Sequence, residues 1–186
     1  FAVERGCAVK GFVREDLRFS LCGLNCLLCP MNLGGYCPGC GGGAGNQGCA
    51  HARCSVKKGG LSYCWQCGDY PCALYEGAEA YDSFISHARQ LTDTGRFMEI
   101  GAAAYHDELT RRRAVLDGLL ARHNDGRRKT LFLQAANLLP LKTLEDIIKR
   151  LDANGAGGPP AAQTAADLLL SAAGALGISL KLRKKG

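Results

Sequence analysis

The second half of the chain repeats apolar residues every three or four positions, which is typical of amphipathic helices. A first helix is predicted over residues 73–92 and rests on the apolar residues Leu74, Ala78, Tyr81 and Ile85. Thr94-Gly95 breaks this pattern. A longer helix follows, and its apolar stripe consists of Tyr105, Leu109, Leu116, Leu119, Leu120 and His123. The turn sequence Asn124-Asp125-Gly126 is expected to end it.

Three more helices are predicted after this turn. Residues 128–138 form a short helix that Pro140 stops, and Thr143 begins the next helix. The inward-facing residues of that next helix are Leu144, Ile147, Ile148 and Leu151. After a glycine- and proline-rich linker, the alanine-rich run 161–175 forms the last helix. A short strand over 178–182 completes the predicted elements.

The first 72 residues lack such a period. Residues 1–21 mix charged and apolar positions and are interpreted as an irregular lead-in. From 22 to 72 glycine, proline and cysteine dominate, and the stretch 38–48 cannot sustain a helix or a packed strand. A segment with so few large apolar side chains buries too little surface to offset the entropy of ordering it. We therefore expect its folding to be coupled to metal binding.

The predicted fold class is mainly α, with an irregular, cysteine-rich, metal-stapled N-terminal module followed by a bundle of about four to five helices. The boundary between the two parts falls at Cys72, because the composition changes there and cysteine is absent afterwards. The predicted organisation consists of the lead-in 1–21, the metal-binding module 22–72, a helical domain 73–152, a linker 153–160, and a C-terminal helix with a basic tail, 161–186.

Cysteine is the dominant chemical signal, because ten of the eleven cysteines lie between residues 22 and 72. Dense cysteine indicates either disulfides in an oxidising compartment or thiolate metal sites in a reducing one. The CxxC spacing, as in Cys64 and Cys67, suits thiolates that converge on one ion. The start of the sequence lacks a charged segment followed by an apolar run, and no apolar run is long enough to cross a membrane. We therefore expect a cytoplasmic protein that does not enter a membrane.

The candidate metal ligands are the ten cysteines of this segment, Cys22, Cys26, Cys29, Cys37, Cys40, Cys49, Cys54, Cys64, Cys67 and Cys72. Four close pairs, 26/29, 37/40, 49/54 and 64/67, supply the eight thiolates of two tetrahedral zinc sites. Two zinc ions are therefore the preferred cofactor, and Cys22 and Cys72 are surplus to the pairs. Spacing alone does not decide which cysteines share an ion, because neighbouring pairs can share a site or alternate pairs can cross.

Iron–sulfur clusters are the alternative cofactor, as [4Fe-4S]. The segment CGLNCLLC has the CxxxCxxC spacing of radical enzymes that bind a four-iron cluster, but those enzymes need a barrel that the helical remainder cannot supply. The segment CWQCGDYPC has the CxxCxxxxC spacing of some corrinoid and electron-transfer proteins, and its fourth ligand has to come from upstream. Under this alternative Cys22 and Cys72 become natural ligands.

Other side chains have secondary roles. His51 lies between two of the cysteines and is a secondary candidate ligand, with an exposed loop histidine as the favoured interpretation. Trp65 and Tyr70 interleave the last cysteines and are expected to shield their sulfurs from water. The histidines that follow fall in predicted helices, so no thiol is paired with an activating base and no catalytic residue is assigned.

The formal net charge of +6 at pH 7 makes nucleic acid a partner to consider. That count treats every cysteine as neutral, whereas two four-thiolate zinc sites carry about −2 each and lower the net charge to about +2. The basic residues lie mostly after position 110 on predicted helices, where such runs are usually solvated faces. We therefore expect a protein partner rather than nucleic acid or a membrane.

The order of the cysteines resembles that of a bacterial and archaeal family called domain of unknown function 3795. The resemblance rests on the segments CGLNCLLCP, YCPGC, CAHARC and YCWQCGDYPC, the last of which is followed by Leu74 and Tyr75. It extends through YDSF (81–84), NDGRRKTLFLQAANLLPL (124–141) and LKLRKK (180–185). Membership implies that the helical part belongs to the same functional unit as the cysteines. It supplies no reaction, because none is known for the family, and the family's metal is assumed rather than established.

Two functions from different classes follow. The preferred hypothesis is a zinc-stabilised interaction or adaptor protein, in which two closed four-thiolate sites rigidify the first half and the helical half offers the partner surface. The alternative is a small redox protein with one or two four-iron clusters that transfers electrons to a partner or serves a reductase. A third, less favoured class is an enzyme with an open metal site beside Cys22 or Cys72.

Overall fold

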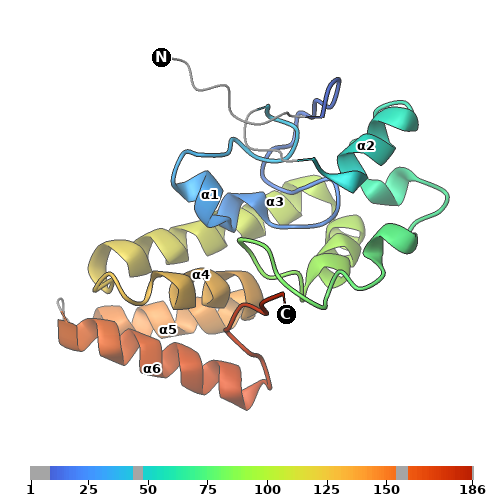
Figure 1. Ribbon diagram of the computed structural model, residues 1–186. Helices are drawn as coiled ribbons and strands as arrows, with labels where there is room; N and C mark the ends of the chain where they lie inside the picture. The colour runs from blue at the N-terminus through green and yellow to red at the C-terminus, as the bar shows by residue number, and fades with distance from the viewer. Residues whose placement is uncertain (1–8, 44–47, 154–158, 186) are drawn as a thin grey trace.

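The computed structural model describes residues 9–43, 48–153 and 159–185, and this part of the chain is mainly helical and contains no strand (Figure 1). The predicted mainly helical class is therefore confirmed. The helices are α1 (Pro30–Leu33), α2 (Ala50–Lys57), α3 (Gln90–Arg122), α4 (Lys129–Leu138), α5 (Leu141–Ala153) and α6 (Pro159–Ala175). Three single 3₁₀ turns lie in the first part of the chain, η1 (Cys26–Leu28), η2 (Cys64–Gln66) and η3 (Ala73–Tyr75).

The long helix α3 bends at one glycine. Gly101 has φ 81° and ψ 164°, so the helix consists of two segments that meet at this residue. The ring of Phe97 packs on Tyr105 with centroids 5.3 Å apart, which holds the two segments together across the corner. The predicted break at Thr94-Gly95 is wrong, since both residues are helical. A positive φ with an extended ψ is open to glycine.

The predicted helix over 73–92 is also wrong, because only Ala73–Tyr75 form a 3₁₀ turn and the chain is irregular up to Gln90. Gly77 interrupts the segment with φ +69°. Backbone groups of this segment bond to side chains instead of to one another. The carboxylate of Asp82 accepts the His87 backbone N–H at 2.8 Å, and the His87 ring lies 3.0 Å from the Ala78 carbonyl oxygen. Such local side-chain hydrogen bonds compete with helix formation.

The three helices that follow α3 are confirmed. Helix α4 begins within a residue of its predicted start, and α5 and α6 each begin two residues earlier than predicted. The predicted strand over 178–182 is wrong, since this segment has no regular structure. Its hydrogen bonds run instead to the chain before α3, as described below.

Helices α3 to α6 enclose the main core, with α4, α5 and α6 stacked on one side of α3 (Figure 1). The largest fully buried side chains of this core include Leu109, Leu116 and Leu119 of α3, Phe132 of α4, Leu144 of α5 and Leu169 of α6. Arg112 is buried among them and donates hydrogen bonds to the carbonyl oxygens of Ala136 and Leu139, at 2.8 and 2.7 Å. This guanidinium satisfies the last carbonyl groups of α4, which have no partner within the helix.

The same core continues across the predicted boundary at Cys72. Phe19 and Leu28 are fully buried in it, and the Phe19 ring stacks on Phe97 of α3 with centroids 5.1 Å apart. The lead-in is also built into the fold, because Arg14 is buried and donates hydrogen bonds to carbonyl oxygens of the cysteine-rich segment, including that of Cys40 at 2.9 Å. The cysteine-rich segment is therefore packed directly against the helices and shares their core.

A buried polar network joins the same two parts. The Asn25 amide donates hydrogen bonds to Asp93 of α3 and to Asn137 of α4, each at 2.9 Å, and accepts one from the Tyr105 hydroxyl at 3.0 Å. Burial raises the pKa of Asp93, and the ion pair with Arg89 at 2.8 Å opposes this rise. Asn25 precedes η1, so this network fixes the first cysteine turn against two helices at once.

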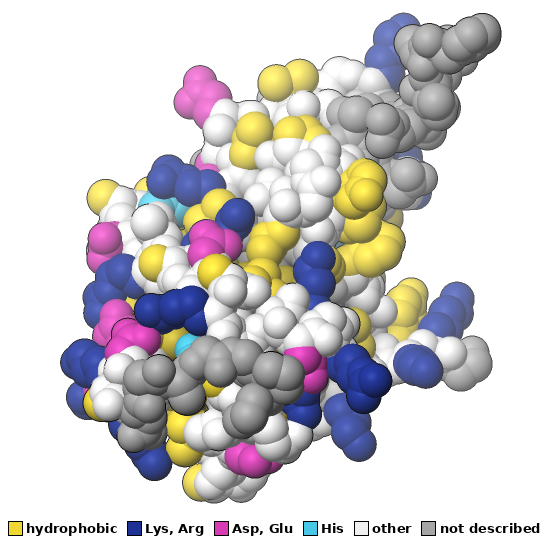
Figure 2. Space-filling model, turned by 90° about the vertical axis from the view of Figure 1, so that its left-hand side faces the viewer, with side chains coloured by type: hydrophobic (Ala, Val, Ile, Leu, Met, Phe, Trp, Pro, Cys, Tyr) yellow, Lys and Arg dark blue, Asp and Glu magenta, His cyan; other side chains and the backbone are white. Residues whose placement is uncertain are grey.

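Charged residues are interspersed on the surface. On the face in Figure 2, Lys and Arg side chains alternate with Asp and Glu over the helical part. Several residues of the basic runs are paired, since Arg111 binds Glu145 at 2.5 Å and Arg113 binds Asp117 at 2.8 Å. None of the helices in the described ranges has the length and apolar character needed to cross a membrane.

The C-terminal segment is clamped to the chain before α3 (Figure 1). The Arg183 guanidinium donates to the buried carboxylate of Asp82 at 2.6 Å, and the Arg183 backbone N–H donates to it at 2.8 Å. Burial opposes ionisation of this carboxyl group, but the hydrogen bonds from Arg183 outweigh it and lower the pKa of Asp82 from 3.8 to about 2.

This clamp predicts a specific loss of stability in acid. Because the pKa of Asp82 is lower in the folded chain than its usual 3.8, the stabilisation is present above about pH 4 and is lost as the pH falls toward about 2. Urea unfolding of the wild type and of Asp82→Asn, measured across this range, tests it. The wild type should be more stable by on the order of 2 kcal/mol near pH 6, and the difference should shrink in acid. A difference that does not change with pH contradicts the assignment.

Candidate functional site

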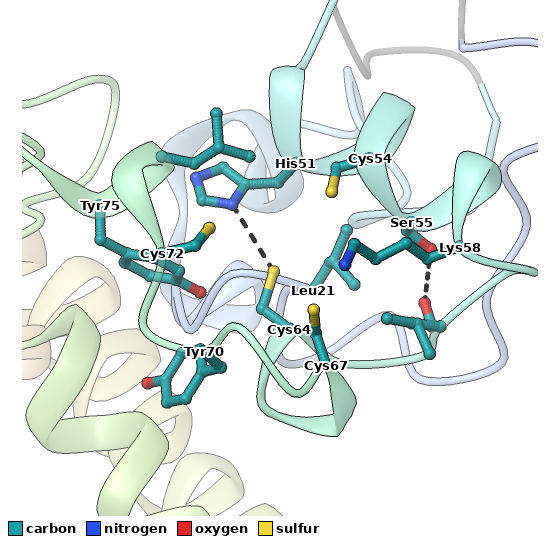
Figure 3. A pocket seen from close by; sticks show the side chains of 12 residues that line it. Leu21, His51, Cys54, Ser55, Lys58, Cys64, Cys67, Tyr70, Cys72 and Tyr75 are labelled. Atoms are coloured by element: carbon teal, nitrogen blue, oxygen red, sulfur yellow. Dashed lines mark hydrogen bonds between the residues drawn. The ribbon is translucent and has the colours of Figure 1, made fainter.

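Four cysteine side chains converge on one small cavity in the first part of the chain (Figure 3). Cys54 comes from α2, Cys64 begins η2, Cys67 follows η2, and Cys72 precedes η3. The cavity has a volume of about 20 Å³ and is also lined by His51, Lys58, Tyr70 and Tyr75. Three separate segments thus bring four thiols to one place.

The turn that carries Cys64 and Cys67 is fixed by its own hydrogen bonds. The Cys67 N–H donates to the Cys64 carbonyl oxygen at 3.0 Å, and the Asp69 N–H donates to the Cys67 sulfur at 3.4 Å. The Gln66 side chain accepts the Tyr63 N–H at 3.0 Å and closes the start of the turn. Backbone amides that point at a sulfur stabilise its thiolate form.

Helix α2 places Cys54 and His51 one turn apart on the side that faces the cavity (Figure 3). The His51 Nδ1 atom lies 3.5 Å from the Cys64 sulfur, and the His51 ring packs edge-on against Tyr75 with centroids 4.9 Å apart. Burial lowers the pKa of His51, and the nearby His87 adds to this effect. A neutral ring at this distance can donate a hydrogen bond to the sulfur of Cys64.

Two tyrosines cover the cavity. Tyr70 and Tyr75 both line it, their rings stand at 89° with centroids 5.4 Å apart, and the Tyr75 hydroxyl donates to the Cys22 carbonyl oxygen at 3.2 Å. Tyr70, which is predicted to shield the sulfurs from water, thus lines the same cavity as four of them. Trp65 lies elsewhere, because its ring stacks on Tyr63 at 4.1 Å between centroids and packs against the main core. The spacing of the cysteines does not indicate that Tyr75 and Lys58 line this cavity.

Several of the other thiols influence one another's pKa, which indicates that they are neighbours. Burial raises the pKa of Cys22 to about 12, with further contributions from Cys40 and Cys49. Burial likewise raises the pKa of Cys26, to which Cys40 and Cys22 contribute. Burial raises the pKa of Cys40, and the guanidinium of Arg14 opposes this rise. Cys22 and Cys40 thus lie near each other and near both Cys26 and Cys49, and Cys22 is also influenced by Cys64 of the cavity.

This second group adjoins the first. Cys40, Cys49 and Cys64 pack on one small apolar cluster formed by Phe12, Leu21 and Ala52. The Cys64 N–H donates to the Leu21 carbonyl oxygen at 2.8 Å, so the turn of the first group is hydrogen-bonded to the loop that carries Cys22. Thiols of both groups therefore contact the same small apolar cluster.

The remaining two cysteines, Cys29 and Cys37, lie near each other. Burial raises the pKa of Cys29, and the neighbouring Cys37 contributes to this rise. The Cys29 sulfur accepts backbone hydrogen bonds from Met31 and Asn32 in α1, while Cys29 also lies near Cys26. Four of the ten described cysteines therefore line the cavity, and each of the other six shares a pKa influence with another cysteine.

These groups differ from the pairs expected from spacing. Of these pairs, 64/67 lies entirely on the cavity, whereas Cys54 lines it without Cys49, and Cys72 lines it as well. The ten cysteines are free thiols. Within the described ranges, no three or more His, Cys, Asp or Glu side chains stand in the arrangement of a metal site. Cys7 lies outside these ranges.

The histidines of the predicted helices have other partners. His106 lies between the Asp16 carboxylate, at 3.0 Å, and the Arg18 guanidinium, at 2.7 Å. His87 lies in the chain before α3 and its ring is 3.0 Å from the Ala78 carbonyl oxygen, and His123 is buried at the end of α3. Their positions leave the thiol cavity with His51 as its histidine neighbour.

A scan against protein-family models, a search of curated proteins and a search of solved structures each found no match for this chain. The resemblance to domain of unknown function 3795 accordingly stays a prediction.

The loop that carries Cys22 depends on a glycine at its contact with α3. Gly23 has φ +100°, and a Cβ atom at this position would lie 2.6 Å from the Gln90 carbonyl oxygen and would also clash with the Thr94 hydroxyl. Gly23→Ala should therefore lower the free energy of unfolding by more than about 2 kcal/mol, measured by urea denaturation.

Gly95→Ala is the matched control for this prediction. Gly95 lies in α3 with open space around its Cα, so an alanine there should leave stability unchanged or raise it by up to about 1 kcal/mol. Equal stability of Gly23→Ala and the wild type contradicts the close packing of this loop on α3.

Proposed function

We propose that this protein binds zinc through Cys54, Cys64, Cys67 and Cys72 and uses the ion to hold its cysteine-rich part in one conformation. The observation that carries the proposal is the convergence of these four thiols from three segments on one cavity. Four thiolates complete the tetrahedral coordination of zinc and leave no open position, which is the pattern of structural rather than catalytic sites.

The size of the cavity supports a single ion. A volume of about 20 Å³ is close to the space that one water molecule needs, and a four-iron cluster is much larger than this. The surroundings also suit thiolates that are neutralised by a cation, because the tyrosines exclude water and the Lys58 ammonium group lies beside Cys67. Four thiolates in one site repel one another strongly unless a cation lies between them.

A second zinc ion is proposed for Cys22, Cys26, Cys40 and Cys49. Its support is the mutual influence of these thiols and the shared contact of Cys40 and Cys49 with one apolar cluster. The guanidinium of Arg14 lies beside Cys40 and complements the negative charge of such a site. Cys29 and Cys37 are not needed under this assignment.

The role that fits two closed sites is that of an interaction or adaptor protein, in which the helical part offers the surface for a protein partner. The second candidate is an iron–sulfur protein that transfers electrons or serves a reductase. One observation favours it, because Cys26 lies near Cys29 and Cys40, while Cys29 lies near Cys37, so these four could instead hold one [4Fe-4S] cluster.

Metal analysis with an absorption spectrum separates the two candidates. Protein that is isolated anaerobically should be colourless and should contain about two zinc ions per chain, which thiol modification releases. A brown protein that contains iron and loses its visible absorption on reduction with dithionite overturns the zinc proposal and favours the cluster.

The grouping of ligands has its own test in Cys72. Since Cys72 lines the cavity, Cys72→Ser should lower the zinc content from about two ions to about one. The matched control is Cys37→Ser, which should retain both ions. Unchanged zinc content in Cys72→Ser would show that this residue is surplus, as the spacing alone suggested.

A further inference from the structure

A second cavity lies away from the thiols, between the chain that leads into α3 and the C-terminal segment. Its volume is about 390 Å³, which is within the range of small-molecule sites. Three cationic side chains line it, from Arg89, Lys181 and Arg183, and no aspartate or glutamate of the described ranges does. The hydroxyl-bearing residues Thr92 and Ser179 also contribute to the wall.

The two guanidinium groups are held in place from behind. The Nε and Nη2 atoms of Arg89 bind the buried carboxylate of Asp93 at 3.0 and 2.8 Å. The same two atoms of Arg183 bind the buried carboxylate of Asp82, with Nη2 at 2.6 Å. Neither Nη1 atom has a hydrogen-bond partner among the described residues. These side chains are therefore ordered before a ligand arrives, which lowers the entropic cost of binding it.

The third cation supplies the uncompensated charge. Asp93 and Asp82 neutralise the two arginines, whereas Lys181 is exposed and has no ion pair with any described residue. The backbone N–H of Lys181 donates to the Ser179 hydroxyl oxygen at 3.4 Å, which restrains the segment that carries it. The cavity as a whole has an excess of positive charge and of hydrogen-bond donors.

The remaining wall is apolar. Ala88, Leu138 and Ile178 line the cavity together with the cationic groups. Arginine and lysine donors bind the oxygen atoms of phosphate and carboxylate groups, and an apolar wall binds carbon skeletons. The cavity is also larger than an inorganic anion needs.

From this arrangement we propose that the cavity binds a small organic oxyanion, a phosphate monoester or a carboxylate, with its anionic group at Arg89, Lys181 and Arg183. The Nη1 atoms and the Lys181 ammonium group donate to the oxygens, and the carbon skeleton lies against the apolar wall. This site is separate from the thiol cavity and does not depend on the identity of the metal.

Calorimetric titration of the full, metal-loaded chain tests the proposal, with phenyl phosphate, benzoate and inorganic phosphate as probes. Saturable binding of one equivalent of phenyl phosphate or benzoate, tighter than that of inorganic phosphate, supports it, and the tighter of the two organic probes identifies the preferred anionic group. Lys181→Ala should weaken this binding about tenfold, since it removes the uncompensated charge. Ser179→Glu introduces a carboxylate into the wall and should abolish it.

Lys142→Ala is the control, because Lys142 is exposed on α5 and paired with Asp146 at 3.2 Å, away from the cavity. It should bind the probes as the wild type does. Both test positions are exposed, so thermal unfolding should show that the variants fold. The proposal is overturned if no probe binds saturably, if Lys181→Ala binds as tightly as the wild type, or if Lys142→Ala loses as much affinity as Lys181→Ala.

Discussion

The side chain of Asn25 is the contact on which the arrangement of the cysteines depends. Its amide is buried and bonds to α3 through Asp93 and Tyr105 and to α4 through Asn137. Loss of one such partner leaves a buried polar group unsatisfied, at a cost of about 1–3 kcal/mol. Because the cysteine-rich segment has a small apolar cluster of its own, this network and the burial of Phe19 and Leu28 attach it to the helical core.

The placement of the thiols follows from that attachment. Gly23 lets the Cys22 loop lie directly against α3, and the Gln90 side chain donates to the Cys22 carbonyl oxygen at 2.9 Å. From this loop, Leu21 accepts the backbone hydrogen bond of Cys64 and so positions η2. The loop that carries Cys22 is therefore ordered by protein contacts, while the part around α2 and η2 has fewer of them. A metal ion at Cys54, Cys64, Cys67 and Cys72 would contribute most to this second part.

The sequence correctly predicts the helices in which the regularly spaced apolar residues are the ones that pack into the core. Helices α4, α5 and α6 are of this kind. The segment 73–92 has the same period, but Gly77 and the hydrogen bonds of Asp82 and His87 give it an irregular conformation. The bend of α3 lies at Gly101 rather than Gly95, and the rings of Phe97 and Tyr105 pack together across the corner.

The cysteine segment remains the predicted location of the candidate site, and the spacing alone does not decide which of its thiols lie together. Cys54 lines the cavity and its neighbour in sequence Cys49 does not, although both influence the pKa of Cys64. Cys72 joins Cys64 and Cys67 because η3 begins beside the same cavity. Such contacts are set by the tertiary structure and cannot be deduced from the CxxC spacing.

X-ray absorption at the metal edges tests the central claim most directly, since it reports the element and its first coordination shell. The account predicts a zinc edge with about four sulfur neighbours at about 2.3 Å and no metal neighbour. An iron edge with iron neighbours at short distance, or a zinc shell dominated by nitrogen and oxygen, would contradict it.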